Sequence, residues 1–107
     1  MNRRAYPKVR TCLLPDGDWI PVCGREAETL IRLEEKRKSD EGLSAYDFAG
    51  GPPFRLGAYV FELRRLGFPI RTERAPHAGG SHAVYFLEAP VAIEVIRPPV
   101  ADGPIAA

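Results

Sequence analysis

Apolar residues recur at helical spacing in the middle of the chain. Leu56, Val60 and Leu63 stand at positions i, i+4 and i+7, so in a helix they form one stripe. Pro53 suits the first helical position, because the N–H that proline lacks would have no partner there. The pattern therefore predicts a helix over residues 53–66 that buries this stripe. The opposite face would carry Arg55, Ala58, Phe61, Glu62 and Arg65.

Gly67 is predicted to end this helix, because glycine readily adopts the left-handed conformation of a helix stop. Leu63 and Phe68 then occupy the two positions whose side chains touch in a Schellman motif. Beyond the stop, two apolar runs separated by a polar segment predict a hairpin. Its expected parts are a strand over 68–74, a long polar loop over 75–82 that holds His77 and His82, and a returning strand over 83–87.

A second hairpin is predicted near the N-terminus. Asp16 and Gly17 mark a tight turn between apolar runs at 11–14 and 19–22. The pairs expected across this turn are Leu14 with Trp19 and Leu13 with Ile20. A further apolar run over 91–96 predicts an extra strand, which would pair with one of the two hairpins.

Two more helices are expected between the hairpins. The first runs over 25–38, with Cys23 as a poor N-cap that we interpret as an inert thiol. Its buried side is expected to hold Ala27, Leu30, Ile31 and Leu33, and its exposed side the pairs Glu28–Arg32 and Glu34–Lys38. Ser44 and Asp47 have the spacing of a capping box and predict a short helix over 43–48. A long helix, a short helix, a glycine turn and another helix follow the order of a helix-turn-helix.

Charge is distributed unevenly along the chain. The 107 residues are 45% apolar and 27% charged, values of an ordinary single globular domain, and the formal net charge is +1. Residues 53–74 hold five Arg and two Glu, a net of +3, whereas the rest holds ten basic and twelve acidic residues, a net of −2. Positive charge is therefore concentrated where an anionic partner would bind. We expect one domain over 1–97, with its core at 25–88, and a flexible tail over 98–107.

The residue types that bind metals or carry out catalysis are not grouped in any known motif. Cys12 and Cys23 are expected to be reduced, and neither they nor the two histidines have zinc-site spacing. Phosphate-binding loops and nucleophile motifs are absent from the sequence. No apolar run has the length of a membrane span, and the N-terminus has no signal-peptide pattern. We expect a cytoplasmic protein that is not an enzyme and needs no metal, cofactor or small-molecule substrate.

Residues 25–87 resemble a small family of winged-helix domains from phages and bacteria. The similarity rests on the helix GREAETLIRLEE, the element Leu43-Ser44-x-x-Asp47 and the segment FRLGAYVFELRRLGFPIRTE. It implies an α+β fold: a winged helix-turn-helix with three helices and a β-hairpin wing, here the hairpin over 68–87. The N-terminal β-hairpin and the C-terminal strand from Val91 are additions that the resemblance does not cover. Tyr59 stands where relatives often carry a basic residue.

The resemblance also implies DNA binding, without a cofactor. The helix over 53–66 would enter the major groove of double-stranded DNA, and the wing would contact the backbone. The candidate DNA-binding residues are Arg55, Ala58, Tyr59, Glu62, Arg65, Arg71, Arg74, His77 and His82. The protein would be a small transcriptional regulator or a phage-type DNA-binding accessory factor. The alternative is a protein-interaction or homodimerisation module, because Phe61 on the free helix face suits a protein partner and the extra strands suit edge pairing.

Overall fold

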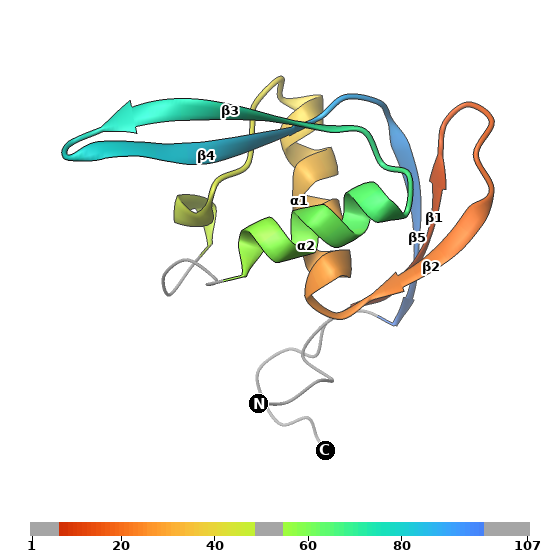
Figure 1. The fold of residues 1–107 in the computed structure, drawn as a ribbon. Helices are drawn as coiled ribbons and strands as arrows, with labels where there is room; N and C mark the ends of the chain where they lie inside the picture. The colour runs from red at the N-terminus through yellow and green to blue at the C-terminus, as the bar shows by residue number, and fades with distance from the viewer. Residues whose placement is uncertain (1–6, 49–54, 98–107) are drawn as a thin grey trace, which may run out of the picture.

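The computed structural model describes residues 7–48 and 55–97, and these form an α+β fold (Figure 1). The elements are β1 (Lys8–Leu13), β2 (Trp19–Cys23), α1 (Gly24–Lys38), the 3₁₀ turn η2 (Ala45–Asp47), α2 (Leu56–Arg65), β3 (Ile70–His77), β4 (Gly80–Leu87) and β5 (Val91–Arg97). Pro53 and the predicted tail over 98–107 lie outside the described residues. None of the helices in the described ranges is long and apolar enough to cross a membrane.

The N-terminal hairpin and the C-terminal strand form one antiparallel sheet in the order β2-β1-β5. The extra strand therefore pairs with the N-terminal hairpin. The predicted register of that hairpin is wrong by two residues, because the observed pairs are Thr11–Ile20 and Cys12–Trp19. The reason is that Leu14 does not pair with β2. Its N–H instead donates to the carbonyl of Pro90, just before β5, at 3.0 Å.

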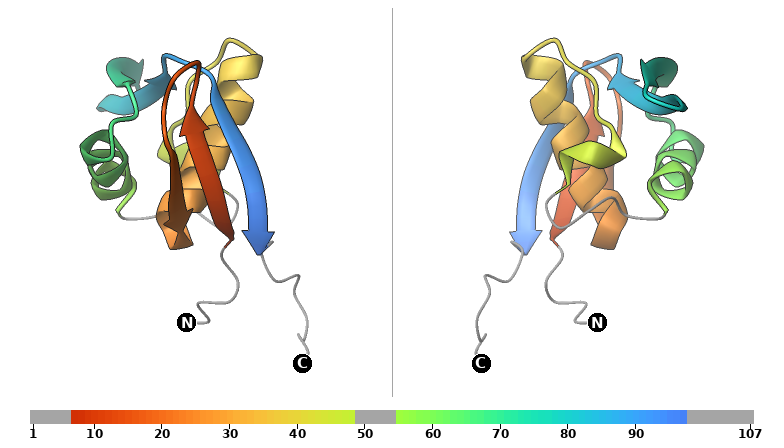
Figure 2. Two further views of the ribbon diagram at one scale, coloured as in Figure 1. Left: turned by 90° about the vertical axis from the view of Figure 1, so that its right-hand side faces the viewer. Right: turned by 90° about the vertical axis from the view of Figure 1, so that its left-hand side faces the viewer.

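Helix α1 lies across one face of this sheet (Figure 2). It begins at Gly24, and Cys23 occupies the N-cap without a side-chain hydrogen bond, as its residue type predicts. Ala27, Leu30 and Leu33 are buried, whereas Ile31 is only partly buried. Together these residues confirm the predicted phase of the helix.

The prediction that Glu34 lies on the exposed side of α1 is wrong. Its side chain is buried, and it accepts two hydrogen bonds of 2.8 Å from the guanidinium of Arg37. The backbone N–H of Val91 also donates to it, at 3.3 Å. Glu34 therefore links α1 to the start of β5. The i,i+4 spacing of charges along the helix, from which its exposure was predicted, does not reveal this contact. Glu28 pairs with Arg25, its Oε1 lying 3.0 Å from Arg25 Nη1, in place of the expected Arg32.

The predicted short helix is a single 3₁₀ turn, η2, so the expected count of three α-helices is wrong for the described residues. The capping box itself is confirmed: the Ser44 N–H donates to Asp47 Oδ2 at 2.8 Å, and the Tyr46 N–H donates to Ser44 Oγ at 3.2 Å. The turn stays short because Leu43 just before it pairs with Tyr85 as an isolated β-bridge. The chain after η2 is extended again at residue 48.

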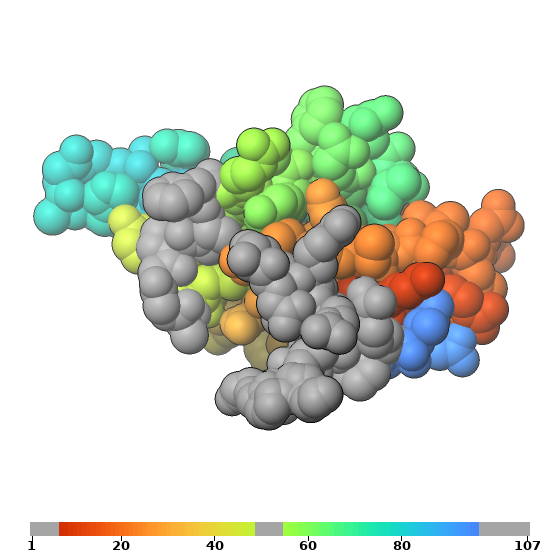
Figure 3. Space-filling view, turned by 90° about the horizontal axis from the view of Figure 1, so that it is seen from below, coloured from red at the N-terminus to blue at the C-terminus, as the bar shows by residue number. Residues whose placement is uncertain are grey.

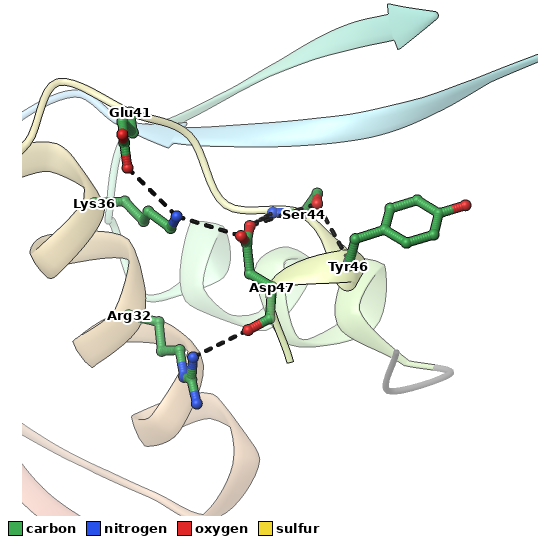
Figure 4. A network of polar contacts seen from close by, with 6 residues as sticks. All are labelled: Arg32, Lys36, Glu41, Ser44, Tyr46 and Asp47. Carbon is green, nitrogen blue, oxygen red and sulfur yellow. Dashed lines mark hydrogen bonds and ion pairs between the residues drawn. The ribbon is translucent and has the colours of Figure 1, made fainter. Parts of the chain in front are cut away.

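Polar contacts hold η2 against α1 (Figure 4). Arg32 donates to the Asp47 carbonyl at 3.2 Å, and Lys36 Nζ lies 3.3 Å from Asp47 Oδ1. Burial raises the pKa of the Asp47 carboxyl, but the Ser44 N–H and the Lys36 ammonium together hold it below its ordinary value. The Tyr46 ring points away from this network and is mostly exposed.

The core lies where α1 packs against the three-stranded sheet and against α2. Its fully buried apolar residues include Val9, Leu30, Leu33, Leu43, Val60 and Leu63. Figure 2 shows the η2 segment on the side of α1 away from the sheet and α2 beside α1, so the outward surface of α2 remains free of other described elements.

Candidate nucleic-acid interface

Helix α2 has the phase and the ending that the sequence predicts. Leu56, Val60 and Leu63 are buried as one stripe. The Phe68 N–H donates to the Leu63 carbonyl at 3.1 Å, and the Gly67 N–H donates to the Arg64 carbonyl at 3.0 Å. These two bonds define a Schellman motif, and Gly67 has the positive φ, +105°, that such a stop requires.

The outward face of α2 mixes charged and apolar groups. Arg55 occupies the N-cap and is exposed, and Ala58 is partly buried one turn further on. Phe61 exposes 58% of its surface. Arg65 lies 3.0 Å from Glu62 in an exposed ion pair.

Tyr59 lies beside the buried stripe and is itself partly buried, so it belongs to the flank of α2. Its backbone N–H donates to the Arg55 carbonyl at 2.9 Å, which starts the first turn. Among the predicted contacts on α2, Arg55, Ala58, Glu62 and Arg65 share the outward side, and Tyr59 lies at the edge of that side.

The wing is longer and more regular than predicted. Strands β3 and β4 pair without interruption from Ile70–Leu87 to His77–Gly80, so the expected long loop is wrong. The turn between them contains only residues 78 and 79, because Gly79 supplies a positive φ of +86° that such a tight turn uses. Pro76 is tolerated near the tip because each strand of a two-stranded ribbon is an edge strand.

Arg64 fixes the wing to α2. Its guanidinium donates to the Ile70 carbonyl through Nε at 3.0 Å and through Nη2 at 2.8 Å, and Nη2 also lies 2.6 Å from Thr72 Oγ1. Tyr85 pairs with Thr72 across the ribbon, and its side chain also faces α2. Its hydroxyl lies so close to Gly57 of α2 that a Cβ added there would be 3.4 Å from it. The sequence placed Arg64 at the helix end but gave no sign of this role.

Alternation along β3 separates the predicted wing contacts. Side chains two apart share a face of a strand, so Arg74 lies with Ile70 and Thr72 on the side of α2. It hydrogen-bonds Ser81 Oγ at 3.3 Å. Arg71 falls on the other face, so the two wing arginines do not act side by side.

On that other face, Arg71 is held by carboxylates. It pairs with Glu73, its Nε lies 2.6 Å from Glu88 Oε2, and its guanidinium stacks 4.4 Å from the centre of the Phe86 ring. Its charge is therefore offset within the protein.

The two histidines meet at the tip of the same face. His77 Nδ1 and His82 Nδ1 are 2.8 Å apart, a hydrogen-bond distance at which one ring donates and the other accepts, and the rings are stacked. The Tyr46 ring packs edge-on against His82, with centroids 4.9 Å apart. Tyr46 was not among the predicted site residues, because its distance in sequence from the wing gave no signal of this contact. Within residues 7–48 and 55–97, no three His, Cys, Asp or Glu side chains are arranged to hold a metal ion.

Pairing reduces the positive charge that residue counting assigns to this surface. From residue 55 to residue 88 there are five Arg and three Glu, a net of +2 without the histidines. Arg65 and Arg71 pair with carboxylates. Among the described residues only Arg55, Arg64 and Arg74 of these five lack a carboxylate partner, and Arg64 is committed to the wing.

Viewed from below, α2 forms a ridge along one side of the molecule, and the wing projects beyond the body at one end (Figure 3). The Arg64 clamp makes these two parts one unit. A protruding helix beside a projecting hairpin can enter a groove and contact the strands that border it.

Comparison with known proteins agrees with this arrangement. A family model described as a winged helix domain matches residues 19–97, which is 79 of the 107 residues. The match includes β2 and β5, which the sequence resemblance left unexplained, and only β1 of the described strands lies outside it. Neither a curated protein nor a solved structure matches the chain.

Proposed function

Because this chain belongs to the winged helix domain family, we propose that it binds double-stranded DNA, with α2 in the major groove and the β3–β4 wing against the backbone. Family membership suggests DNA binding in general terms. The observation that carries the proposal for this chain is the Arg64 clamp, because it holds an uncovered helix face and the wing in one fixed geometry. A small transcriptional regulator or a phage-type accessory factor is the role we assign to it.

The placement of the side chains gives each a distinct task. Arg55 and Arg74 have no carboxylate partner among the described residues, so both are available to phosphates. Arg65 would reach a base edge or a phosphate by leaving Glu62, an exposed pair that costs little to open. Ala58, Tyr59 and Glu62 would line the same groove.

The opposite face of the wing would contact backbone on its own side. Arg71, His77 and His82 lie there. Because Arg71 is paired with two carboxylates, we expect it to add less to affinity than Arg74.

The test is a fluorescence-anisotropy titration of the full chain with a random-sequence duplex at several salt concentrations. Each phosphate contact contributes a slope of about −0.9 when the logarithm of affinity is plotted against that of salt concentration. Four arginine contacts, from Arg55, Arg65, Arg71 and Arg74, would give a slope of roughly −3 to −4. Binding that does not weaken with salt, or no binding at low ionic strength, would refute the proposal.

A matched pair of variants locates the surface. Arg74→Gln should make the slope shallower by about one unit for every duplex. Arg10→Gln is the control, because Arg10 lies on the three-stranded sheet in an exposed pair with Glu94. An equal effect of both variants would show that binding is a non-specific response to total charge.

The second candidate function is a protein-interaction or homodimerisation module. It is favoured by the exposed Phe61 and by β5, whose outer edge has no strand partner among the described residues and carries exposed Val95 and Ile96. Such an edge can pair with a second copy. Sedimentation of the parent and of Phe61→Ala tests it, and a dimer that persists without salt-sensitive DNA binding would make this the better assignment.

A further inference from the structure

The outward face of α2 is apolar at its centre. Phe61 lies opposite the buried stripe and exposes 58% of its surface. Side chains on a helix lean toward its N-terminus, so this ring leans over the turn that contains Gly57 and Ala58. Because both of these residues are small, a surface that approaches α2 here meets the phenyl ring first.

Few polar groups remain on α2 to read bases by hydrogen bonding. Arg64 is committed to the wing, and Arg65 is paired with Glu62. The sequence of the helix, LGAYVFELRR, contains no Asn, Gln, Ser, Thr or His, the side chains that commonly bond adenine and other base edges. Apart from Glu62 and Arg65, which hold each other in an exposed ion pair, the outward face of the helix offers only apolar atoms with which to distinguish one base pair from another.

Among the four unmodified bases, thymine alone presents an apolar group in the major groove, its C5 methyl. We propose that Phe61 reads this methyl group, so that α2 selects duplex sites with thymine at the positions facing its ring. The inference rests on the proposed function, because it requires DNA to lie against α2.

The charges around Phe61 favour a duplex as the occupant of this face. Arg55 lies before the first turn of α2, Arg65 lies in its last turn, and Arg74 lies on the side of the wing that faces α2. In the major groove, base methyl groups lie between two lines of phosphates. An apolar ring with arginines around it is complementary to this arrangement. A protein partner would have to supply carboxylates at the same places.

The experiment removes the methyl group from the DNA. Preferred duplexes are first selected from a random pool with the full chain. Each thymine in the selected site is then replaced by uracil, which lacks only the C5 methyl and keeps every hydrogen-bonding group. Affinities are measured by anisotropy at one fixed salt concentration. At one or two positions we expect the affinity to fall about fourfold for each methyl contacted, the effect of burying one such group.

Variants assign the effect to the ring. Phe61→Ala should bind the thymine and uracil duplexes equally, and Phe61→Leu should keep part of the difference. Trp19→Ala is the control, because it removes another exposed ring, on β2, and should leave the thymine-to-uracil ratio unchanged. Circular dichroism of each variant checks that it folds, as the exposure of both rings leads us to expect.

The outcomes separate this inference from the proposed function. Equal affinity for thymine and uracil duplexes, or a pool that yields no preferred site, would overturn methyl reading while salt-dependent binding still stands. A ratio that persists in Phe61→Ala would assign the methyl contact elsewhere and also overturn it. Absence of any salt-dependent duplex binding would remove both, and Phe61-dependent binding to a protein would then assign this face to a protein partner.

Discussion

Replacement of Gly42 by alanine tests how the wing is packed against the rest of the chain. An alanine Cβ at this position would lie 2.4 Å from Val84 Cγ1 and 2.7 and 2.8 Å from two carbons of the Phe86 ring. Non-bonded carbons normally stay about 3.5–4.0 Å apart, so each overlap is roughly 1 Å. The backbone cannot easily move away, because Leu43 is fully buried and exchanges two hydrogen bonds of 2.8 Å with Tyr85.

The expected cost follows from these overlaps. Overpacking typically costs about 1–3 kcal/mol, and three contacts against one paired strand place Gly42→Ala in the upper part, about 2–3 kcal/mol. Loss of glycine also reduces the conformational freedom of the unfolded chain, which returns about 0.4–1 kcal/mol. The net loss of unfolding free energy should be about 1–2.5 kcal/mol. For a domain of this size, that corresponds to a fall in Tm of about 5–15 °C.

Urea denaturation followed by circular dichroism measures this loss. Gly67→Ala is the matched control: its added Cβ meets no atom within 4 Å, so its cost comes from the positive φ alone. In a Val84→Ala background, Gly42→Ala should cost less, because the closest overlap is gone. A loss below about 0.5 kcal/mol, the usual size of a surface effect, or an equal loss in both backgrounds would refute the packing argument.

Three further predictions concern other parts of the fold. Leu63→Ala should lower the unfolding free energy by about 2–5 kcal/mol in urea denaturation, because this side chain is fully buried between α2 and α1; a loss below about 1 kcal/mol would contradict the helix phase. Cys23→Ser should raise stability by about 0.3–1 kcal/mol by supplying the missing N-cap acceptor without changing DNA affinity, and rapid alkylation of Cys23 at neutral pH with loss of binding would contradict its inert role. Asp47→Asn should cost about 1 kcal/mol at pH 7, since the pKa of Asp47 is lowered on folding. A carboxyl with a lowered pKa stabilises the fold above its unfolded pKa and loses this effect as pH falls through the folded pKa, so in an acid titration the difference between parent and variant should shrink as the pH falls below the ordinary range of an aspartate.

The sequence alone determined those features that depend on neighbours within a few residues. The phase of α2, its Schellman stop at Gly67 and the Ser44–Asp47 capping box all follow from local spacing and local hydrogen bonds. Helical periodicity likewise placed Phe61 on the outward side of α2, because its position in the helix turns its side chain away from the buried stripe. Its partner on that side, DNA or protein, stays a prediction.

The tertiary structure decided what depends on residues far apart in the chain. The hairpin register is set by a bond between Leu14 and Pro90, and Glu34 is buried because it bonds to Val91, 57 residues away. In the wing, one of the two carboxylates that neutralise Arg71 comes from Glu88, on the far side of the hairpin turn. Counting charges could not foresee this, because the free charge of a surface depends on which ions the fold brings within bonding distance.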